Sequence, residues 1–510
     1  MRPAILQHRN IWFPTGCVVL VVGVLLHLPM LAHAHAMDNR LAGMGMDRAM
    51  MAGMLAIAAG AAIACYGALR TTGKSIIADA VPVFEAPRST TLNRWHAGLL
   101  AVLTLGLIID VMKPATLGFV LPGLAKEYAI PRSTAALLPL VALIGTVIGS
   151  FLWGWLADRY GRRASIIVST ILFVSTSVCG AMPTFEWNLV MCFLMGVSAG
   201  GMLPVVYTLL AEILPSRHRS WLLVLVGGTG LVGGYLAASL SAYLFEPMFG
   251  WRSLWLQGFP TGILLLALAR FIPESPRFLV GQGRHRELAE VQQRYGLVAL
   301  PARPAMERQI PAHTGTRRLT TALAITALSW SFVNFGLLLW LPSDLQARGF
   351  SPSVVSGLIS KSALIGLPAV MFAAWSYSRW SSKWTLVGAI SLTLAGLIGL
   401  LLPSAILGWT PVAVVVIATV IVGTNVTIAA LLPYSAENYS VRVRGRATGL
   451  VAGSSKLGGV AVQSFALLGL FPTLGQAALA LAIPTALSAA LLAWAGRETK
   501  GSSLGQLDAT

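Results

Sequence analysis

Charged residues are scarce in this chain. Of its 510 residues, 11% are Asp, Glu, Lys or Arg, whereas 56% are hydrophobic. A soluble globular domain carries about a quarter charged residues, so this scarcity excludes an ordinary soluble enzyme and indicates a membrane protein. Cysteine is equally rare, and Cys17, Cys65, Cys179 and Cys192 all fall within apolar runs. We therefore expect packed thiols rather than a disulfide framework.

Long apolar runs are the abundant feature. A bilayer core of about 30 Å requires about 20 apolar residues per helix, and we count fourteen runs of that kind. Two lie at 11–33 and 47–69, and the other twelve lie at 97–120, 134–157, 164–183, 188–211, 220–245, 253–272, 321–343, 353–376, 384–403, 410–434, 446–468 and 473–495. The sequence thus predicts an all-α polytopic membrane protein in which two extra N-terminal helices precede a twelve-helix core.

The basic residues are distributed as membrane topology demands. Lys and Arg accumulate in the cytoplasmic loops of membrane proteins. If the helix at 97–120 starts inside, most arginines between helices fall in inside loops, and the outside loops hold Lys126, Arg132, Arg252 and Arg348. The formal charge of +18 therefore indicates orientation in a bacterial-type inner membrane with both termini cytoplasmic. It does not indicate a nucleic-acid partner.

One charged stretch, GWLADRYGRR at 154–163, follows the second core helix. Its glycines, Gly154 and Gly161, permit a tight reversal. Its basic residues Arg159, Arg162 and Arg163 hold the turn inside, and Asp158 lies at the helix end. A basic turn required for orientation alone would explain the arginines equally well.

The charged stretch recurs later in the chain, and membrane orientation alone does not explain this repetition. At an offset of 220, AWSYSRWSSKWTL aligns with GWLADRYGRRASI, with Asp158 replaced by Ser378. At an offset of 225, AENYSVRVRG aligns with AEILPSRHRS and pairs Glu212 with Glu437, Arg217 with Arg442, and Arg219 with Arg444. We therefore predict an extension at 1–95, two duplicated bundles at 96–272 and 321–497, a cytoplasmic linker at 273–320 and a tail at 498–510. Duplicated bundles are typical of secondary transporters.

Four stretches together resemble the major facilitator superfamily, in its sugar-porter and metabolite:proton symporter branch. They are GWLADRYGRR, MGVSAGGMLPVVYTLLAEILPSRHRS, PESPRFLVGQGR and PYSAENYSVRVRGRATG. The resemblance covers about 96–497 and implies alternating access, with Asp158 latching to the start of the eleventh core helix in the outward-open state. Cys192 stands where many members have Arg, and SWSFVNFGLLLWLP lacks the sugar-porter glutamines. The seventh core helix instead resembles organic-ion and aromatic-acid carriers.

Charges inside the helices are the candidates for chemistry. Each costs roughly 2.5 to 3.5 kcal/mol at mid-bilayer and tends to face a cavity or a partner. Asp110 and Lys113 share one face of the first core helix, Lys361 lies in the eighth, and Lys456 lies in the eleventh. In one account Asp110 and Lys113 form a local neutral pair. In the other, three lysines make a central cavity that binds an organic anion, Asp110 exchanges protons, and its protonation frees Lys113 to hold a carboxylate.

Uncharged polar groups supply further candidates. Asn334 and Asn425 lie mid-helix and could either bind substrate or clamp helices together, and Tyr207, Trp330 and Gln463 could line the cavity. Nothing resembles a nucleotide site or a catalytic domain, so we predict no enzyme, no cofactor and no metal. We expect a monomer that imports a small organic anion with protons. A proton-driven drug or metabolite exporter and a sensor without transport activity are the alternatives.

The N-terminal extension allows two interpretations. Its basic start, apolar middle and Ala-x-Ala resemble a cleaved signal peptide, but the apolar run is long for one, so we favour two retained helices. The turn between them is rich in imidazole and thioether groups, which are suitable copper ligands. They are His27, Met30, His33, His35, Met37, Met44 and Met46. Methionine is also common filler in apolar helices, so we predict no copper site there.

Overall fold

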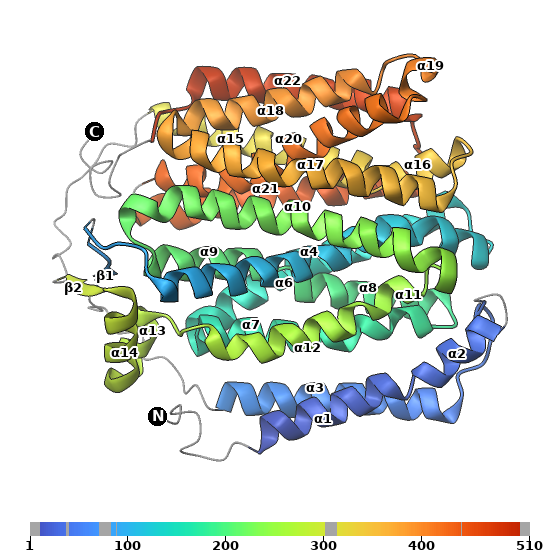
Figure 1. Ribbon diagram of the computed structural model, residues 1–510, viewed down its shortest axis with the longest axis horizontal. Coiled ribbons are helices and arrows are strands. Elements are labelled where there is room, and N and C mark those ends of the chain that lie inside the picture. The colour runs from blue at the N-terminus through green and yellow to red at the C-terminus, as the bar shows by residue number, and fades with distance from the viewer. Residues whose placement is uncertain are drawn as a thin grey trace.

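The computed structural model describes residues 11–36, 40–70, 83–87, 89–300, 314–439 and 441–499. Long helices run roughly parallel in it, and Figure 1 shows them lying along one axis. Thirteen helical stretches of the described residues are long and apolar enough to cross a membrane. The fourteenth predicted run is present as α21 (Val441–Leu467) but does not reach that apolarity, because Lys456 and several glycines lie within it.

The first bundle contains six spans. They are α4 (Arg94–Glu127), α6 (Leu137–Tyr160), α7 (Arg162–Ser175) with its 3₁₀ extension η2 (Thr176–Ala181), α8 (Phe185–Ala199) with α9 (Met202–Ile213), α10 (Ser216–Phe249), and α11 (Ser253–Leu256) with α12 (Gly258–Leu268) and η3 (Ala269–Phe271). The short helix α5 (Arg132–Ala135) precedes α6. This bundle occupies the middle layer of Figure 1.

The second bundle forms the upper layer of Figure 1. It contains α15 (Thr314–Ser331), the π-helix η4 (Phe332–Leu338), α16 (Leu341–Ala347), α17 (Pro352–Arg379), α18 (Ser382–Gly399), α19 (Ser404–Leu407), α20 (Thr410–Glu437), α21 and α22 (Leu474–Ala495). The bundles meet where α10 packs on α17 and α20, α4 on α16, and α6 on α21.

Glycines in α10 allow this close packing on two sides. A Cβ on Gly228 would lie 2.7 Å from Val370 of α17, and one on Gly234 would lie 2.6 Å from Val111 of α4. Real Cβ atoms do not approach side chains so closely, so larger residues would push these helices apart. The GGTGLVGGYLAAS stretch therefore places α10 between its own bundle and the other.

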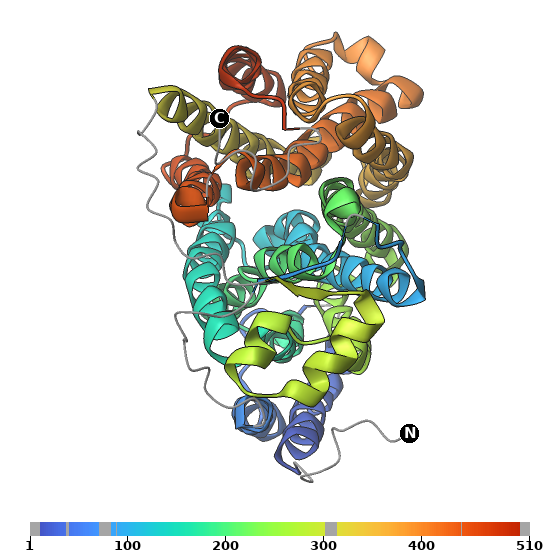
Figure 2. The same ribbon diagram turned by 90° about the vertical axis from the view of Figure 1, so that its left-hand side faces the viewer.

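The predicted linker forms two short helices, α13 (Pro276–Gly281) and α14 (His285–Tyr295). It also contains an element that the sequence did not predict. Strand β2 (Val298–Leu300) pairs antiparallel with β1 (Val83–Glu85), with Phe84 opposite Ala299. We call this side of the molecule, which carries the 158–163 turn and the linker, the basic end, and the far side the opposite end. Figure 2 views the basic end, with the linker in front of the first bundle.

The N-terminal extension forms a helical hairpin of α1 (Trp12–Leu25) and α2 (Leu28–Ala36) against α3 (Arg48–Arg70). Its helices pack closely at glycines. A Cβ on Gly16 would lie 2.2 Å from Ala64, and one on Gly60 would lie 2.4 Å from Leu20. The hairpin lies at the bottom of Figure 1 and packs on the first bundle through α7. Of the imidazole and thioether groups considered as copper ligands, His35 and Met37 lie outside the part whose side chains are described.

Candidate functional site

Two opposite charges from different bundles lie close together. Asp110 of α4 is 8% exposed, and it lies near enough to Lys456 of α21 for each charge to act on the other. Neither side chain has a hydrogen-bond or ion-pair partner among the described residues. A carboxylate and an ammonium that lack direct partners inside a membrane protein indicate a functional site.

The predicted pairing of Asp110 with Lys113 is wrong. Lys113 is 1% exposed, and its Nζ donates to the Phe173 carbonyl at 2.6 Å and to Thr176 Oγ1 at 2.5 Å. It also lies 4.5 Å from the centre of the Phe173 ring. Lys113 therefore points into the first bundle toward α7 and η2, because three residues along a helix still rotate a side chain by about 60°.

The predicted place of Lys361 in the cavity is also wrong. Lys361 is exposed, and the same face of α17 carries Leu364, Ile365 and Phe372, which are 58%, 49% and 66% exposed. Ile359 faces the other bundle, and two residues further along a helix point about 200° away. Lys361 therefore lies on the outer apolar surface of α17.

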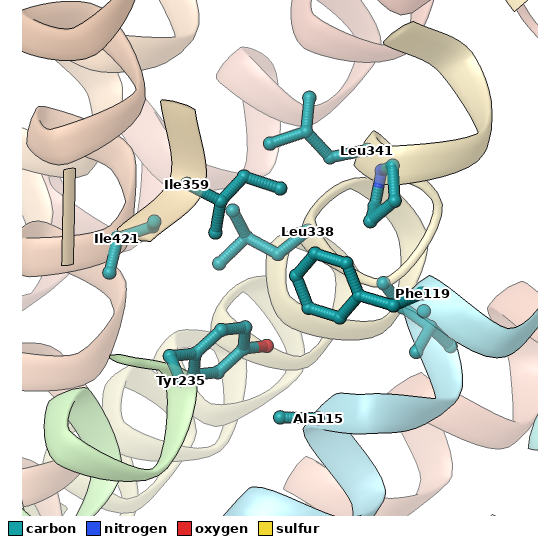
Figure 3. Close-up of a pocket in the computed structure, with 10 residues that line it drawn as sticks. Ala115, Phe119, Tyr235, Leu338, Leu341, Ile359 and Ile421 are labelled. Atoms are coloured by element: carbon teal, nitrogen blue, oxygen red, sulfur yellow. The ribbon is translucent and has the colours of Figure 1, made fainter. Parts of the chain in front are cut away.

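A narrow pocket lies between the bundles. Figure 3 shows Tyr235 of α10 with Ala115 and Phe119 of α4 on one side, and Leu338 with Ile421 of the second bundle on the other. Its free space holds about one water molecule. This pocket therefore admits a substrate only when the bundles move apart.

Asn334 forms a hydrogen bond across this boundary, whereas the Asn425 amide bonds within its own helix. Asn334 lies in η4, and its Oδ1 accepts a hydrogen bond of 3.1 Å from the Tyr235 hydroxyl of the other bundle. Asn425 is fully buried and donates to the Ile421 carbonyl of its own helix at 2.8 Å. The Oδ1 of Asn425 has no partner among the described residues. The sequence analysis did not single out Tyr235. Its place directly after two glycines of α10 was the signal that could have identified it.

The predicted cavity-lining residues have separate positions. The Tyr207 hydroxyl donates to the Ala429 carbonyl across the bundle boundary at 3.4 Å. Gln463 is fully buried within the second bundle. Trp330 lines a small pocket inside the second bundle whose other walls are mostly hydroxyl groups, including Thr424, and the Nε1 of Trp330 and the Oγ1 of Thr424 lack partners in the described structure.

The GWLADRYGRR turn is organised by two glutamates. Arg162 donates to Glu212 at 3.3 Å and lies 3.4 Å from Asp158, whose side chain is 79% exposed. The Glu274 carboxylate accepts the backbone N–H of Arg162 at 2.7 Å and caps the start of α7. Burial raises the pKa of Glu274, whereas hydrogen bonds from backbone N–H groups such as that of Arg162 act to lower it. Gly161 has a φ of +97°, and a Cβ there would lie 2.3 Å from Glu274 Oε2.

The other basic residues of this turn and of the AEILPSRHRS stretch make fewer contacts with its two glutamates. Arg159 is exposed and lies over the rings of Trp155 and Tyr160. Arg163 is partly buried, Arg217 is exposed, and Arg219 donates to the Leu214 carbonyl at 3.3 Å. Gly154 lies inside α6, and a Cβ added there would have no neighbouring atom within 4 Å. The tight reversal therefore depends on Gly161 rather than on Gly154.

The second copy of the motif replaces arginine with hydroxyl groups. Glu437 accepts hydrogen bonds from Tyr377 at 2.9 Å, Thr499 at 2.7 Å and Ser220 of the first bundle at 2.5 Å. Glu498 accepts the backbone N–H of Ser382 at the start of α18, as Glu274 does at α7. The repeat analysis paired Glu212 with Glu437, but it missed the correspondence of Glu274 with Glu498. The side chains of Arg442 and Arg444 lie outside the described part.

Two bundles of spanning helices, with opposite charges between them and a repeated charged turn at one end, define the class of two-bundle membrane transporters. The sequence profile of the Major Facilitator Superfamily matches residues 103–463. The chain belongs to this family, which confirms the resemblance inferred from its motifs. It is therefore an integral membrane transporter of small molecules and not an enzyme.

Several named relatives are transporters of niacin or of 4-hydroxybenzoate. The niacin transporter NiaP of Acinetobacter baylyi is 29% identical over 314 residues, which cover 59% of this chain and 71% of the relative. The 4-hydroxybenzoate transporter PcaK of Pseudomonas putida is 29% identical over 447 residues, covering 82% and 96% of the two chains. The fold is similar to a partially occluded inward-open structure of the xylose transporter XylE from E. coli, with a TM-score of 0.65, 18% identity, and coverage of 81% and 100%.

Proposed function

We propose that this protein imports small organic anions, of which monocyclic aromatic carboxylates are the best candidates, together with protons. The observation that carries the proposal is that Asp110 of α4 and Lys456 of α21, two intramembrane charges on different bundles, lie near enough to act on each other. Relatives named for niacin and 4-hydroxybenzoate support the substrate class, because both compounds carry a carboxylate on an aromatic ring.

The pair couples the two solutes through charge. While Asp110 is ionised, it stabilises the Lys456 ammonium and weakens the attraction of that ammonium for a second anion. Protonation of Asp110 leaves Lys456 with an uncompensated charge, which a substrate carboxylate then neutralises. Proton and anion therefore bind together more favourably than either binds alone, and both are released when the bundles open toward the other side. Lys113 and Lys361 take no direct part in this mechanism.

The membrane arrangement belongs to the same proposal. The arginine distribution places the basic end in the cytoplasm, and the α1–α3 hairpin crosses the membrane as a retained pair of helices beside α7. Both termini are then cytoplasmic, and the monomer is the transporting unit in the plasma membrane. Labelling of single cysteines introduced at Lys126 and Arg286, with a membrane-impermeant thiol reagent on intact cells, tests this orientation. Reaction at 286 rather than at 126 would contradict it.

Uptake into proteoliposomes tests the coupling. We expect labelled niacin or 4-hydroxybenzoate to accumulate when the pH outside is lower than the pH inside. Lys456→Gln should lower uptake by about tenfold or more, because a hydrogen bond to a charged group contributes about 1.5 to 3 kcal/mol. Asp110→Asn should abolish the dependence on the pH gradient.

Lys361→Gln is the matched control, because it removes the same charge from the outer surface of α17 and should leave uptake nearly unchanged. Equal losses in Lys456→Gln and Lys361→Gln would contradict the assignment of Lys456. Transport of cationic drugs without transport of any carboxylate would instead favour the exporter alternative.

A further inference from the structure

The opposite end of the molecule is closed by a charged contact between the bundles. Arg132 of α5 donates from Nη2 to Asp344 Oδ1 of α16 at 2.5 Å. Its guanidinium also lies 4.9 Å from the centre of the Trp340 ring and 4.7 Å from that of Phe471. These two rings meet nearly edge to face, with centroids 5.3 Å apart. Arg132 therefore fits into an aromatic corner provided by the second bundle.

The guanidinium is not fully paired in this contact. Asp344 takes Nη2 with a single oxygen, and the Nε of Arg132 has no hydrogen-bond partner among the described residues. The Arg132 side chain is 35% exposed, whereas that of Asp344 is 14% exposed. An arginine fork binds a carboxylate best through two parallel N–H groups. The Nε is buried, so the partly exposed end of the guanidinium, beyond the single Asp344 contact, is the part that a second carboxylate can reach from solvent.

The aromatic corner is connected to the charged site. The Trp340 Nε1 donates to Gln463 Oε1 at 3.3 Å, and Gln463 Nε2 donates to the Phe335 carbonyl of η4 at 2.6 Å. Gln463 lies seven residues after Lys456, so both side chains share one face of α21. Hydrogen bonds therefore connect the corner to the helix that carries Lys456 and to the π-helix that carries Asn334.

The backbone holds Arg132 at the end of a constrained turn. Ala129 has a φ of +51°, which non-glycine residues rarely adopt. Close by, the Gly118 position of α4 lies against the Leu339 carbonyl of the other bundle, where a Cβ would approach to 2.6 Å. The turn and the glycine together allow α4 and α5 to reach the second bundle at this end.

We propose that Arg132 is a gate residue at which an incoming carboxylate competes with Asp344. In the closed state the Asp344 carboxylate holds Arg132 in the aromatic corner. A substrate carboxylate that binds the free side of the guanidinium replaces Asp344, and the opposite end then opens toward Lys456. This inference rests on the proposed carriage of organic anions, and it assigns them an entry site separate from the central pair.

The gate is tested by a distance that needs no substrate. Spin labels on cysteines introduced at Lys126 and Ala347, in a background without the four native cysteines, report the separation of the bundles at this end. We expect Asp344→Asn and Arg132→Gln each to increase the open population by about tenfold, as loss of a charge-assisted hydrogen bond predicts. Glu287→Gln, which removes a 2.7 Å ion pair inside the linker, should leave the distance unchanged.

Competition is tested by the half-saturating concentration of external carboxylate in uptake. Asp344→Asn removes the competitor and should lower this concentration, whereas Arg132→Gln removes the binding group and should raise it. Arg132→Lys, which keeps the charge, should fall between Arg132→Gln and the unaltered protein. A gate without substrate competition would shift both variants in the same direction, which would overturn the proposal. Unchanged label distances would overturn the gate itself, and absence of carboxylate uptake with a working gate would refute the proposed function instead.

Discussion

At the scale of single residues, the two glycines of the GWLADRYGRR motif have different tasks. Gly161 must adopt a positive φ and leaves no room for a Cβ beside Glu274. We expect Gly161→Ala to lower the free energy of unfolding by about 2 to 3 kcal/mol, because such backbone strain alone costs about 1 to 3 kcal/mol. The measurement is the melting temperature in detergent.

Gly154→Ala is the control, since Gly154 lies inside α6 with open space around it. A Gly-to-Ala change in a helix interior stabilises by about 0.5 to 1 kcal/mol, so this variant should melt at the same temperature or higher. Equal destabilisation by both substitutions would mean that the Glu274 contact is unimportant.

The same scale shows what sequence reasoning about the site could state and what it could not. Intramembrane charge identified Asp110 and Lys456 as candidates, since each is exceptional in its helix. It could not predict which of the other lysines share the site. Lys113 is rotated by about 60° from Asp110 around α4 and points into the first bundle, and Lys361 is rotated by about 200° from Ile359 around α17 and lies on the outer surface. Helix orientation depends on packing against neighbours, which the sequence does not state.

At the scale of elements, a buried ion pair joins the N-terminal hairpin to the first bundle. Glu127 binds Arg252 at 2.6 Å, with side chains 6% and 2% exposed, and accepts the backbone N–H groups of Leu41 and Ala42 at 2.7 and 3.0 Å. Glu127→Gln leaves the buried Arg252 without its counter-charge. We expect a loss of about 3 to 5 kcal/mol in the free energy of unfolding.

Limited proteolysis measures whether the hairpin also loosens, and we expect faster cleavage between α2 and α3 in Glu127→Gln. The matched control is Glu290→Gln, which removes the exposed pair with Arg294, where both side chains are 47% exposed. Exposed pairs contribute below about 1 kcal/mol. A Glu127→Gln protein as stable as this control would contradict the role of Glu127 in holding the hairpin.

The helices themselves were largely predictable, and the small elements were not. Runs of apolar residues predicted the positions of the spanning helices of both bundles, because a helix satisfies its own backbone groups in lipid. The β1–β2 pair was missed because three-residue strands leave no pattern and their pairing partners lie more than 200 residues apart. The π-helix η4 was missed because SWSFVNFGLLLWLP contains no glycine pair or proline before Pro342 that marks an irregular turn.

At the scale of the whole molecule, the duplicated bundles have become unequal. In the first bundle Arg162 binds Glu212, whereas in the second Ser382 stands at the equivalent place and Glu437 is held by hydroxyl groups. One of these hydroxyls, Ser220, belongs to the first bundle. Where the first bundle has an arginine–glutamate pair, the second has a glutamate that bonds to Ser220 of the first bundle at the basic end. The repeat offset predicted that Glu212 and Glu437 correspond, but it could not predict this exchange of partners.

We expect the Ser220 hydroxyl group to bias the balance between open and closed states. Ser220→Ala removes the 2.5 Å contact with Glu437, while Tyr377 and Thr499 still bind the same carboxylate and preserve the second bundle. We expect the population open at the basic end to rise by about tenfold, because a hydrogen bond to a charged group contributes about 1.5 to 3 kcal/mol.

Spin labels on cysteines introduced at Arg286 of α14 and Trp380 after α17 measure that opening. Ser435→Ala is the control, because the Ser435 hydroxyl donates at 2.8 Å to Leu432 of its own helix and joins no bundles. If the bundles rock as rigid bodies, opening of the basic end closes the opposite end. Ser220→Ala should then leave the distance between labels at Lys126 and Ala347 unchanged or shorter. If both ends opened together, Ser220 would hold the bundles as a static clamp and would not bias alternating access.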